Sequence, residues 1–423
     1  MRELRDNGIS KTLYSNVYYG LRLRADDEPL FPNLKALDLW RIREPLIPLI
    51  PLFLPPTITS VSLGGLAYDL DESEVLSAVE GFLRPFPNVQ DIALHQLPRH
   101  PVITAAASKM FFVSNRNALR RFHVDSPLTE EATEAICKLK NLCSLSMIIE
   151  KGTPIPSALL PNLTHLQLKC DDGSDGLQLL RRATFGKLKS INFHAESGPI
   201  DDFLEALKGA PLSSSIQNTF SVIRLSAKQS WDPNYSSFLP FTQLVDLSIE
   251  PSCDDGCSRV DDDVVISLSR AMPKLKSLQL GDLPCRRFTG GVTAKGLVAL
   301  ARNCPNLSSL CVHFQAVSLS DPPAGLETTH NAGYSVSWTG CALTKLEVGK
   351  ILVPEGSASI IALTLLRIFP RIETIGSING TWREVENMIR RSKQIFDCSS
   401  KYRHLTVPRN SWLTLLRCWS YGQ

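Results

Sequence analysis

A short spacing of apolar residues, L-x-x-L-x-L, recurs along most of this chain. In residues 275–310 it opens at Leu275 and begins again at Leu307. Leu278 and Leu280 are two residues apart, so in a strand their side chains point to the same face, whereas the segment VTAKGLVALAR between the two openings has the apolar spacing of an amphipathic helix. Each unit therefore predicts one strand and one helix that share an apolar interface.

About thirteen copies of this spacing are found when other apolar residues are allowed at the leucine positions, and consecutive copies are on average about 28 residues apart. They open at Leu34, Ile58, Val89, Leu119, Leu142, Leu163, Leu188, Phe220, Leu244, Leu275, Leu307, Leu343 and Ile372. One strand and one helix cannot enclose a core, but stacked neighbours can. The pattern therefore predicts an α/β repeat solenoid with a parallel inner sheet of about thirteen short strands, covered by outer helices and loops.

A proline precedes many of these openings and supports the same division of the chain. It lies in the segments FPNL 31–34, FPNV 86–89, LPNL 160–163, MPKL 272–275, CPNL 304–307 and FPRI 369–372. A proline cannot continue a helix, and it biases the residue before it toward extended backbone. We therefore expect a turn into the next strand at each of these segments.

Residues 291–307, GVTAKGLVALARNCPNL, resemble the cysteine-containing subtype of leucine-rich repeat found in F-box receptor proteins. The resemblance is carried by Thr293, Gly296, Leu297, Leu300, Ala301, Cys304, Pro305, Asn306 and Leu307. Residues 259–275 are similar, with Met272 in place of the cysteine. The irregular repeat lengths and FPNL openings are also similar to divergent F-box and leucine-rich-repeat proteins of mushroom-forming fungi. The resemblance implies a horseshoe-shaped leucine-rich-repeat solenoid over residues 31–378, whose concave face recognises a substrate protein for a ubiquitin ligase.

The chain departs from the family pattern in two ways. The asparagine or cysteine three residues after the last strand leucine is replaced by Ile42, Leu66, Leu97, Glu150, Asp171, Leu283 and Ile351, so the side-chain ladder that caps the inner turns is expected to be absent. An F-box is not visible in residues 1–30, which we interpret as an N-terminal cap or the remnant of a missing module. Either the sequence is a truncated gene product, or the family's ligase role does not carry over. Residues 379–423 are predicted to form a C-terminal helix and cap.

Amphipathic helices are predicted in the longer connections, several of them with acidic first turns that suit the helix dipole. They are expected in residues 71–86, 129–142, 201–210, 260–272 and 356–369. Residues 151–161 are expected to form a loop or a single turn. Longer insertions occupy 197–219, 226–241 and 314–341, and the last of these is rich in Ser, Gly, Thr and Pro, which predicts a mobile surface loop.

The charge, the apolar stretches and the cysteines of the sequence indicate which partners and which cell compartment to expect. The formal net charge is +3, from 45 basic and 42 acidic residues, so no strong field recruits a nucleic acid or a membrane. The longest apolar stretch, residues 45–56, is too short to cross a bilayer and contains prolines. The 11 cysteines lack paired spacing and the N-terminus lacks an apolar signal core, which favours a reducing compartment, cytoplasmic or nuclear.

Residues that flank the last two apolar positions of each unit are predicted to point out of the inner sheet, on its concave face. We call them the sheet-face strip: Asp38, Trp40, Asp91, His95, Arg121, His123, Asp125, His165, Lys169, Asn192, His194, Arg224, Asp246, Glu250, His313, Lys345 and Glu347. The strip is polar and mixed in sign. Because strands stack about 4.8 Å apart, the whole sheet would present a surface on the order of 60 Å long, which suits a protein partner.

Five histidines fall on the sheet-face strip, and they have two interpretations. They are a metal-binding or pH-sensitive patch, or they are solvated residues one repeat or more apart and therefore too far from one another to share an ion. The second interpretation is favoured, so no metal is expected. Cys253 and Cys257 have the spacing of half a metal site, but no second Cys or His pair matches it.

No catalytic or nucleotide-binding motif is legible, so neither an enzyme nor a cofactor is expected. The first hypothesis is a protein-binding solenoid that forms the substrate-recognition part of an F-box-type ubiquitin ligase receptor, with an adaptor only if an F-box lies upstream. The alternative is a leucine-rich scaffold or inhibitor that acts without a ligase. Trp40 and Trp231 are candidate anchors for the partner, although packing within the solenoid is the favoured role for each.

Overall fold

The protein is described here by a computed structural model. The described residues are 3–6, 31–40, 55–64, 88–95, 118–198, 200, 202–209, 219–231, 233–252, 260–281, 291–320, 340–348, 353–377, 380 and 382–401. The chain forms two compact units, the N-terminal unit Met1–Gln229 and the C-terminal unit Ser230–Gln423. Each is considered by itself.

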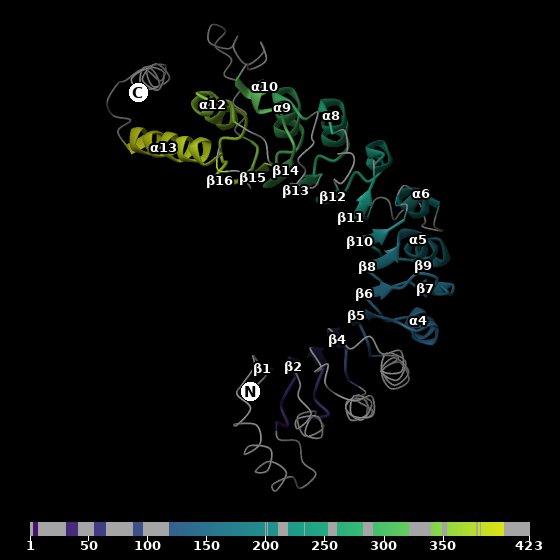
Figure 1. Cartoon of the computed structure of the whole chain (residues 1–423). Helices are drawn as coiled ribbons and strands as arrows, with labels where there is room; N and C mark the ends of the chain where they lie inside the picture. Colours follow the sequence, from purple (N-terminus) through teal and green to yellow (C-terminus); the bar gives the residue numbers. More distant parts are fainter. Residues whose placement is uncertain are drawn as a thin grey trace. The chain divides into compact units, whose positions relative to one another are not determined.

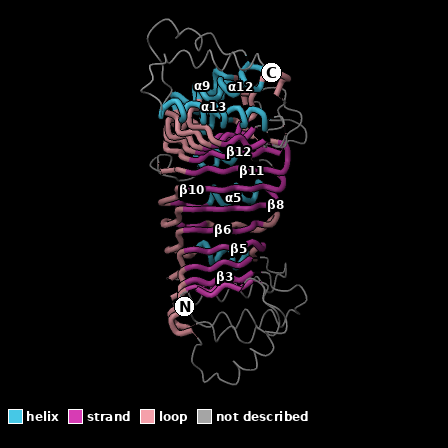
Figure 2. Tube along the Cα trace, turned by 90° about the vertical axis from the view of Figure 1, so that its left-hand side faces the viewer, coloured by secondary structure: helices cyan, strands magenta, loops and turns pink. Residues whose placement is uncertain are grey.

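The N-terminal unit is built on a sheet in which every strand pairs in parallel with the next. Figure 2 shows these strands side by side. The strands are β1 (Glu3–Asp6), β2 (Ala36–Trp40), β3 (Ser60–Gly64), β4 (Asp91–His95), β5 (Arg121–Pro127), β6 (Ser144–Ile149), β8 (His165–Asp172), β10 (Ser190–Ser197) and β11 (Val222–Ser230). Strand β1 was not predicted, and it lies within the segment interpreted as a cap or remnant.

The C-terminal unit repeats this arrangement, and four of its five described strands have only four residues each. The strands are β12 (Asp246–Ser252), β13 (Ser277–Leu280), β14 (Ser309–Val312), β15 (Lys345–Val348) and β16 (Thr374–Ser377), again all parallel. Every strand predicted from the apolar spacing is therefore present in one unit or the other. The fold is that of a leucine-rich-repeat solenoid, as predicted.

One backbone carbonyl before each strand fixes the register of the next repeat. The carbonyl of Lys35 accepts hydrogen bonds from the backbone N–H groups of Thr59 and Ser60, at 2.9 and 3.1 Å. The same pair of bonds recurs at the other acceptors in the two units, namely Thr59, Gln90, Arg120, Cys143, Thr164, Lys189, Val245, Lys276, Ser308 and Thr344. Because two donors share one acceptor, each strand begins at a defined height beside its neighbour.

The expected turns into the strands are present where they can be examined. The N–H of Leu34 donates to the carbonyl of Phe31 at 3.0 Å, and the N–H of Leu307 donates to that of Cys304 at 3.1 Å. These are four-residue turns with the proline at the second position, where its fixed backbone angle is suited to a turn. The proline thus ends one repeat, and the leucine three residues after the start of the turn is the first buried residue of the next.

Helices lie on one face of the strands in each unit, as Figure 1 shows. In the N-terminal unit they are α4 (Glu130–Cys137), α5 (Gly173–Arg182) and α6 (Asp202–Gly209). In the C-terminal unit they are η2 (Tyr235–Phe238), α8 (Asp262–Ala271), α9 (Ala294–Asn303), α10 (Ala316–Ser320), α12 (Ala358–Ile368) and α13 (Trp382–Lys401). No described helix covers the other face of the strands, which we call the open face.

Most of the predicted helices are confirmed, with differences in the connections. Residues 151–161 were expected to be a loop, but they contain β7 (Ala158–Leu160), which pairs with β9 (Ala183–Phe185) in a small separate sheet. Helix α5 was not predicted, because Gly173 and Gly176 weaken its helical pattern. The insertion 314–341 begins with α10. The helix predicted at 71–86, the remainder of that insertion and the terminal cap after residue 401 lie outside the described residues.

Neighbouring helices of the C-terminal unit are joined through the motif that carries the resemblance. Asp262, in the first turn of α8, accepts hydrogen bonds from the N–H of Thr293 at 2.8 Å, the hydroxyl of Thr293 at 2.6 Å and the N–H of Gly296 at 3.1 Å. A Cβ at Gly296 would lie 2.5 Å from the Oδ1 atom of Asp262, so a glycine is needed for this close approach. Thr293 in turn caps α9 through the N–H of Lys295.

Cys304 is the C-cap residue of α9, and it is buried, as predicted. Its thiol lies 3.5 Å from the carbonyl of Met272 and 3.6 Å from that of Ser269 in the preceding repeat. Burial, together with the neighbouring Cys341, raises the pKa of the Cys304 thiol to about 12. The thiol is therefore a packing group and not a nucleophile at neutral pH.

Two further expectations concern the residues that cap the inner turns and the presence of a membrane-spanning helix. Of the positions where the family's ladder residue is replaced, Glu150 and Asp171 are described, and both are exposed, so neither caps an inner turn. Among the described residues, no helix combines the length and the apolar composition that a bilayer crossing requires.

Candidate protein-binding face

The sheet-face strip lies on the open face of the sheet in the N-terminal unit. Along β5 and β8 exposed or half-buried residues alternate strictly with buried ones, so Arg121, His123 and Asp125 share one side, as do His165 and Lys169. Asn192, His194 and Arg224 follow the same alternation on β10 and β11, and Asp38 and Asp91 are half-buried on β2 and β4. The leucines between them are buried on the opposite side, which is the physical origin of the polar strip.

His313 was predicted to be on the strip, and this is wrong. It lies one residue after the end of β14 and is only 4% exposed. The chain leaves the sheet here, because the carbonyl of His313 accepts a hydrogen bond from the N–H of Val292 and Phe314 forms a β-bridge with Val292. Its ring packs over Gly281, where a Cβ would be 3.2 Å away.

The two tryptophans proposed as anchors have different outcomes. Trp231 is 7% exposed, and this burial agrees with the favoured interpretation. The side chain of Trp40 lies outside the described part of the structure, although its backbone ends β2. Neither tryptophan therefore adds a described aromatic group to the open face.

Asp91 and Arg121 form a charged pair across neighbouring strands. They are opposite one another in the register of β4 and β5, and the guanidinium donates to both carboxylate oxygens at 2.6 Å. The bidentate hydrogen bond to Asp91 raises the pKa of Arg121. The two parallel hydrogen bonds give the pair a defined geometry on the face.

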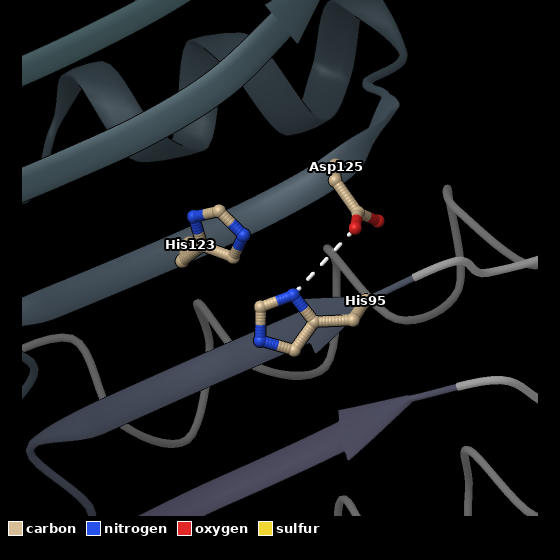
Figure 3. A group of neighbouring side chains, drawn as sticks. All are labelled: His95, His123 and Asp125. Atoms are coloured by element: carbon tan, nitrogen blue, oxygen red, sulfur yellow. Dashed lines mark ion pairs between the residues drawn. The ribbon is translucent and has the colours of Figure 1, made fainter. Parts of the chain in front are cut away.

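His95, His123 and Asp125 converge one step further along the same two strands (Figure 3). The Nδ1 atom of His95 is 3.5 Å from the Oδ2 atom of Asp125, and the rings of His95 and His123 have centroids 4.5 Å apart. One nitrogen or oxygen from each side chain lies within 4.8 Å of those from the other two. The expectation that histidines one repeat apart are too distant to share an ion is therefore wrong for this pair, because neighbouring repeats place them on adjacent strands.

His123 is held toward its neutral form. Burial lowers the pKa of the imidazole, and the nearby His95 lowers it further, while Asp125 acts in the opposite direction. Because the pKa of His123 is therefore below its ordinary value of 6.5, the ring is mainly neutral at pH 7 and carries a nitrogen lone pair.

Glu196 is the centre of a second charged group at the other end of the N-terminal unit's described face. It forms an ion pair with Lys228, a second with Lys169 at 3.1 Å and a third contact with His194 at 3.3 Å. Hydrogen bonds from Lys228 and then Lys169 lower the pKa of Glu196 to about 2. The other nitrogen of His194 lies 2.8 Å from the hydroxyl of Ser226, so this ring is fixed on both sides.

Glu196 and Lys228 were missed in the sequence analysis, because only the residues flanking the leucine pair were considered. Strands β10 and β11 continue beyond that pair, and the same alternation holds as far as Glu196 and Lys228. The signal that could have found them is this continued alternation in the segments INFHAES and VIRLSAKQS.

The strip in the C-terminal unit is shorter. Lys345 and Glu347 lie on β15 and form an ion pair at 2.5 Å, and the hydrogen bond that Lys345 donates to Glu347 raises the pKa of Lys345. Asp246 and Glu250 are half-buried on β12, and Glu250 accepts a hydrogen bond from Ser248 at 2.9 Å. These residues form local pairs, and the described part of this unit adds no larger charged group.

The similarity of this chain to known proteins is structural. No protein-family model matches it, and no curated protein sequence matches it. Among solved structures, a chain in the yeast complex of Rad7 and Elc1 is similar over 82% of this chain and 86% of that chain, with 17% sequence identity and a TM-score of 0.47.

Proposed function

We propose that this chain is a non-enzymatic protein-binding module whose partner docks on the open face of the N-terminal unit. The observation that carries the proposal is the organisation of that face: polar side chains lie in columns across adjacent strands and are held by fixed charge pairs. Asp91 with Arg121, and Glu196 with Lys169 and Lys228, are such pairs. Pre-positioned side chains lose little entropy on binding, which favours recognition.

The chemistry of the face favours a protein over a polyanion. Both signs of charge lie along it, with the acidic residues Asp38, Asp91, Asp125 and Glu196 and the basic residues Arg121, Lys169, Arg224 and Lys228. A nucleic acid needs a surface on which basic residues dominate. A protein partner with charges of both signs matches this face, and complementary charges would set the orientation and the rate of association.

A finer form of the proposal concerns the cellular role. The similarity of residues 259–310 to cysteine-containing repeats of F-box receptors supports a role as the substrate-recognition part of a ubiquitin ligase, with an adaptor bound through an F-box. The alternative is a scaffold or inhibitor that binds its partner without a ligase.

The test is an affinity capture from the native cell type, followed by mass spectrometry and by measurement of affinity for each recovered protein. The face variant carries Lys169→Glu, Arg224→Glu and Lys228→Glu. Its matched control carries Lys140→Glu, Lys187→Glu and Lys189→Glu, three exposed lysines in or beside the turns that precede the strands. Both variants have the same net charge, so a general effect of charge appears in both.

We expect the face variant to bind the partner at least about tenfold more weakly, because like charges brought together at an interface cost several kcal/mol. The control variant should bind like the wild type. Recovery of a ligase adaptor and a cullin with the wild-type chain would support the finer role. Binding that survives in the face variant, or is lost equally in both variants, would contradict the proposed face.

A further inference from the structure

Two histidines and one carboxylate meet on the open face beside the Asp91–Arg121 pair. The register of β4 with β5 places Ala93 beside His123 and Leu94 beside Val124. One step further, His95 lies beside Asp125, with its Nδ1 atom turned toward the carboxylate, while a ring nitrogen of His123 points toward the space between them (Figure 3). The three side chains come from two consecutive repeats, which the fold places on adjacent strands.

The strand geometry favours this convergence. The pairing of β5 with β6 loses its regular register between His123 and Pro127, so Asp125 lies in an irregular part of the strand. Such irregularities redirect side chains and are frequent beside functional sites. Ala93, in register with His123, has a small side chain, which leaves room for the two imidazole rings to approach.

The donor set is typical of a transition-metal site. Imidazole nitrogen and carboxylate oxygen are ligands of zinc, and three protein ligands with a fourth position left open are a common zinc arrangement. In a tetrahedral site, bonds of about 2.0–2.1 Å place neighbouring ligand atoms about 3.3 Å apart. The distance of 3.5 Å between His95 Nδ1 and Asp125 Oδ2 is already close to this value. The third ligand atom needs only a small side-chain rotation, since all three lie within 4.8 Å of one another.

We propose that His95, His123 and Asp125 bind a zinc-type divalent transition metal on the open face of the N-terminal unit. The fourth coordination position faces the solvent, since all three side chains are only half-buried, and it is filled by water or by a donor from a bound partner. Calcium and magnesium do not fit, because they require mainly oxygen ligands and this set supplies a single carboxylate. The inference concerns the metal alone and does not depend on the proposed protein-binding function.

The contrasting explanation is that His95 and Asp125 form an ordinary ion pair and His123 is a bystander. The two explanations differ in what they predict for metal affinity. The experiment uses the full chain with Cys253→Ser and Cys257→Ser in all samples, because these two cysteines have the spacing of half a metal site. After treatment with a chelator, each sample is titrated with Zn²⁺ by calorimetry, and with Co²⁺ to record its visible absorption.

The variants are His123→Gln and the nearly isosteric Asp125→Asn, and the control is His165→Gln. His165 is exposed on β8, on the same face but outside the cluster, where its Nδ1 atom contacts the hydroxyl of Thr164 at 2.8 Å. Circular dichroism confirms that each variant is folded. We expect one Zn²⁺ per chain in the parent and in the control, and at least about tenfold weaker binding in the two cluster variants, since even outer-shell substitutions cost tenfold or more.

Three results would overturn the proposal. They are the absence of Zn²⁺ binding by the parent, equal affinity in the parent and the cluster variants, and a thiolate charge-transfer band in the Co²⁺ spectrum that shows cysteine ligands. An intense visible Co²⁺ spectrum without that band, lost in Asp125→Asn and kept in His165→Gln, would support it.

Discussion

The two units use the same repeat in different ways. In the N-terminal unit β8, β10 and β11 run for eight or nine residues and extend past the buried leucine pair, so each carries additional polar residues onto the open face. In the C-terminal unit β13 to β16 have four residues each and end at the last apolar residue or just after it. The longer strands β8, β10 and β11 carry the charged group around Glu196, whereas β13 to β16 carry little beyond local pairs.

The described helices of the two units also differ in the contacts at their N-terminal ends. In the N-terminal unit α4 is capped by Thr129 and α5 by Asp172, each the residue directly before its helix. In the C-terminal unit Asp262 of one repeat binds Thr293 and Gly296 of the next, and the Cys304 thiol contacts carbonyls of the preceding repeat. Helices α8 and α9 of the C-terminal unit are therefore joined at their starts, in addition to their local caps Asp261 and Thr293.

The largest effect on stability is expected from a change in the buried leucine pair, which both units share. Leu278 is 1% exposed, so Leu278→Asp should lower the free energy of unfolding by more than about 3 kcal/mol, because it buries an unpaired charge and removes apolar packing. Urea unfolding followed by circular dichroism measures the change. The control Gln279→Asp, on the open side of the same strand, should cost less than about 1 kcal/mol. Equal losses would refute the assignment of faces.

A smaller effect tests the capping that distinguishes the C-terminal unit. Asp262→Ala leaves the N–H groups of Thr293 and Gly296 without their acceptor and should cost about 1–2 kcal/mol. Asp263→Ala is the matched control, since Asp263 is exposed in the same first turn of α8. Thermal and urea unfolding of both variants give the difference. If the two losses are alike, Asp262 acts only on the dipole of its own helix and does not join the two repeats.

The smallest effect on stability is expected at the charged group around Glu196 in the N-terminal unit. The pKa of Glu196 in the folded protein, about 2, is below its ordinary value of 4.5, so its ion pairs contribute stability above pH 4.5 that is lost as the pH falls toward 2. Because Lys169 and Lys228 are well exposed, the contribution should be less than about 1 kcal/mol.

Glu196→Gln should therefore be slightly less stable than the wild type at pH 7 and equally stable near pH 2, by urea unfolding at a series of pH values. Added salt should reduce the difference at pH 7, since exposed charges are screened. A difference that stays constant across this range of pH would show that the carboxylate charge is not its cause. Glu373→Gln, an exposed position in the C-terminal unit, serves as the control.

The strands could be predicted from the sequence because their signals are local. Leu278 and Leu280 reveal a buried strand face by their spacing alone, and the proline of each FPNL-type segment marks the turn that precedes a strand. Helix α5 was missed because its glycines weaken the local pattern, although Gly176 is required where Phe193 and Cys170 pack closely against it. A constraint imposed by a neighbouring repeat is not visible in the local sequence.

The candidate site was harder to predict for the same reason. The alternation of residues gave the correct side for Arg121, His123 and Lys169, but it could not show that His313 leaves the sheet to pair with Val292. The meeting of His95 with His123 and Asp125 depends on the register between two repeats. Each carbonyl acceptor sets that register, and the apolar spacing within one repeat does not reveal it.

The carbonyl acceptors ahead of the strands also decide where this chain tolerates a change in length. From Lys35 to Thr59 the chain advances by 24 residues and from Ser308 to Thr344 by 36, yet both acceptors receive the same two hydrogen bonds. An extra residue inside such a connection lengthens a loop at small entropic cost. An extra residue between an acceptor and its strand would move every following side chain to the opposite face and turn leucines toward the solvent. Length can therefore drift in the connections, while the few residues that enter each strand must keep their number.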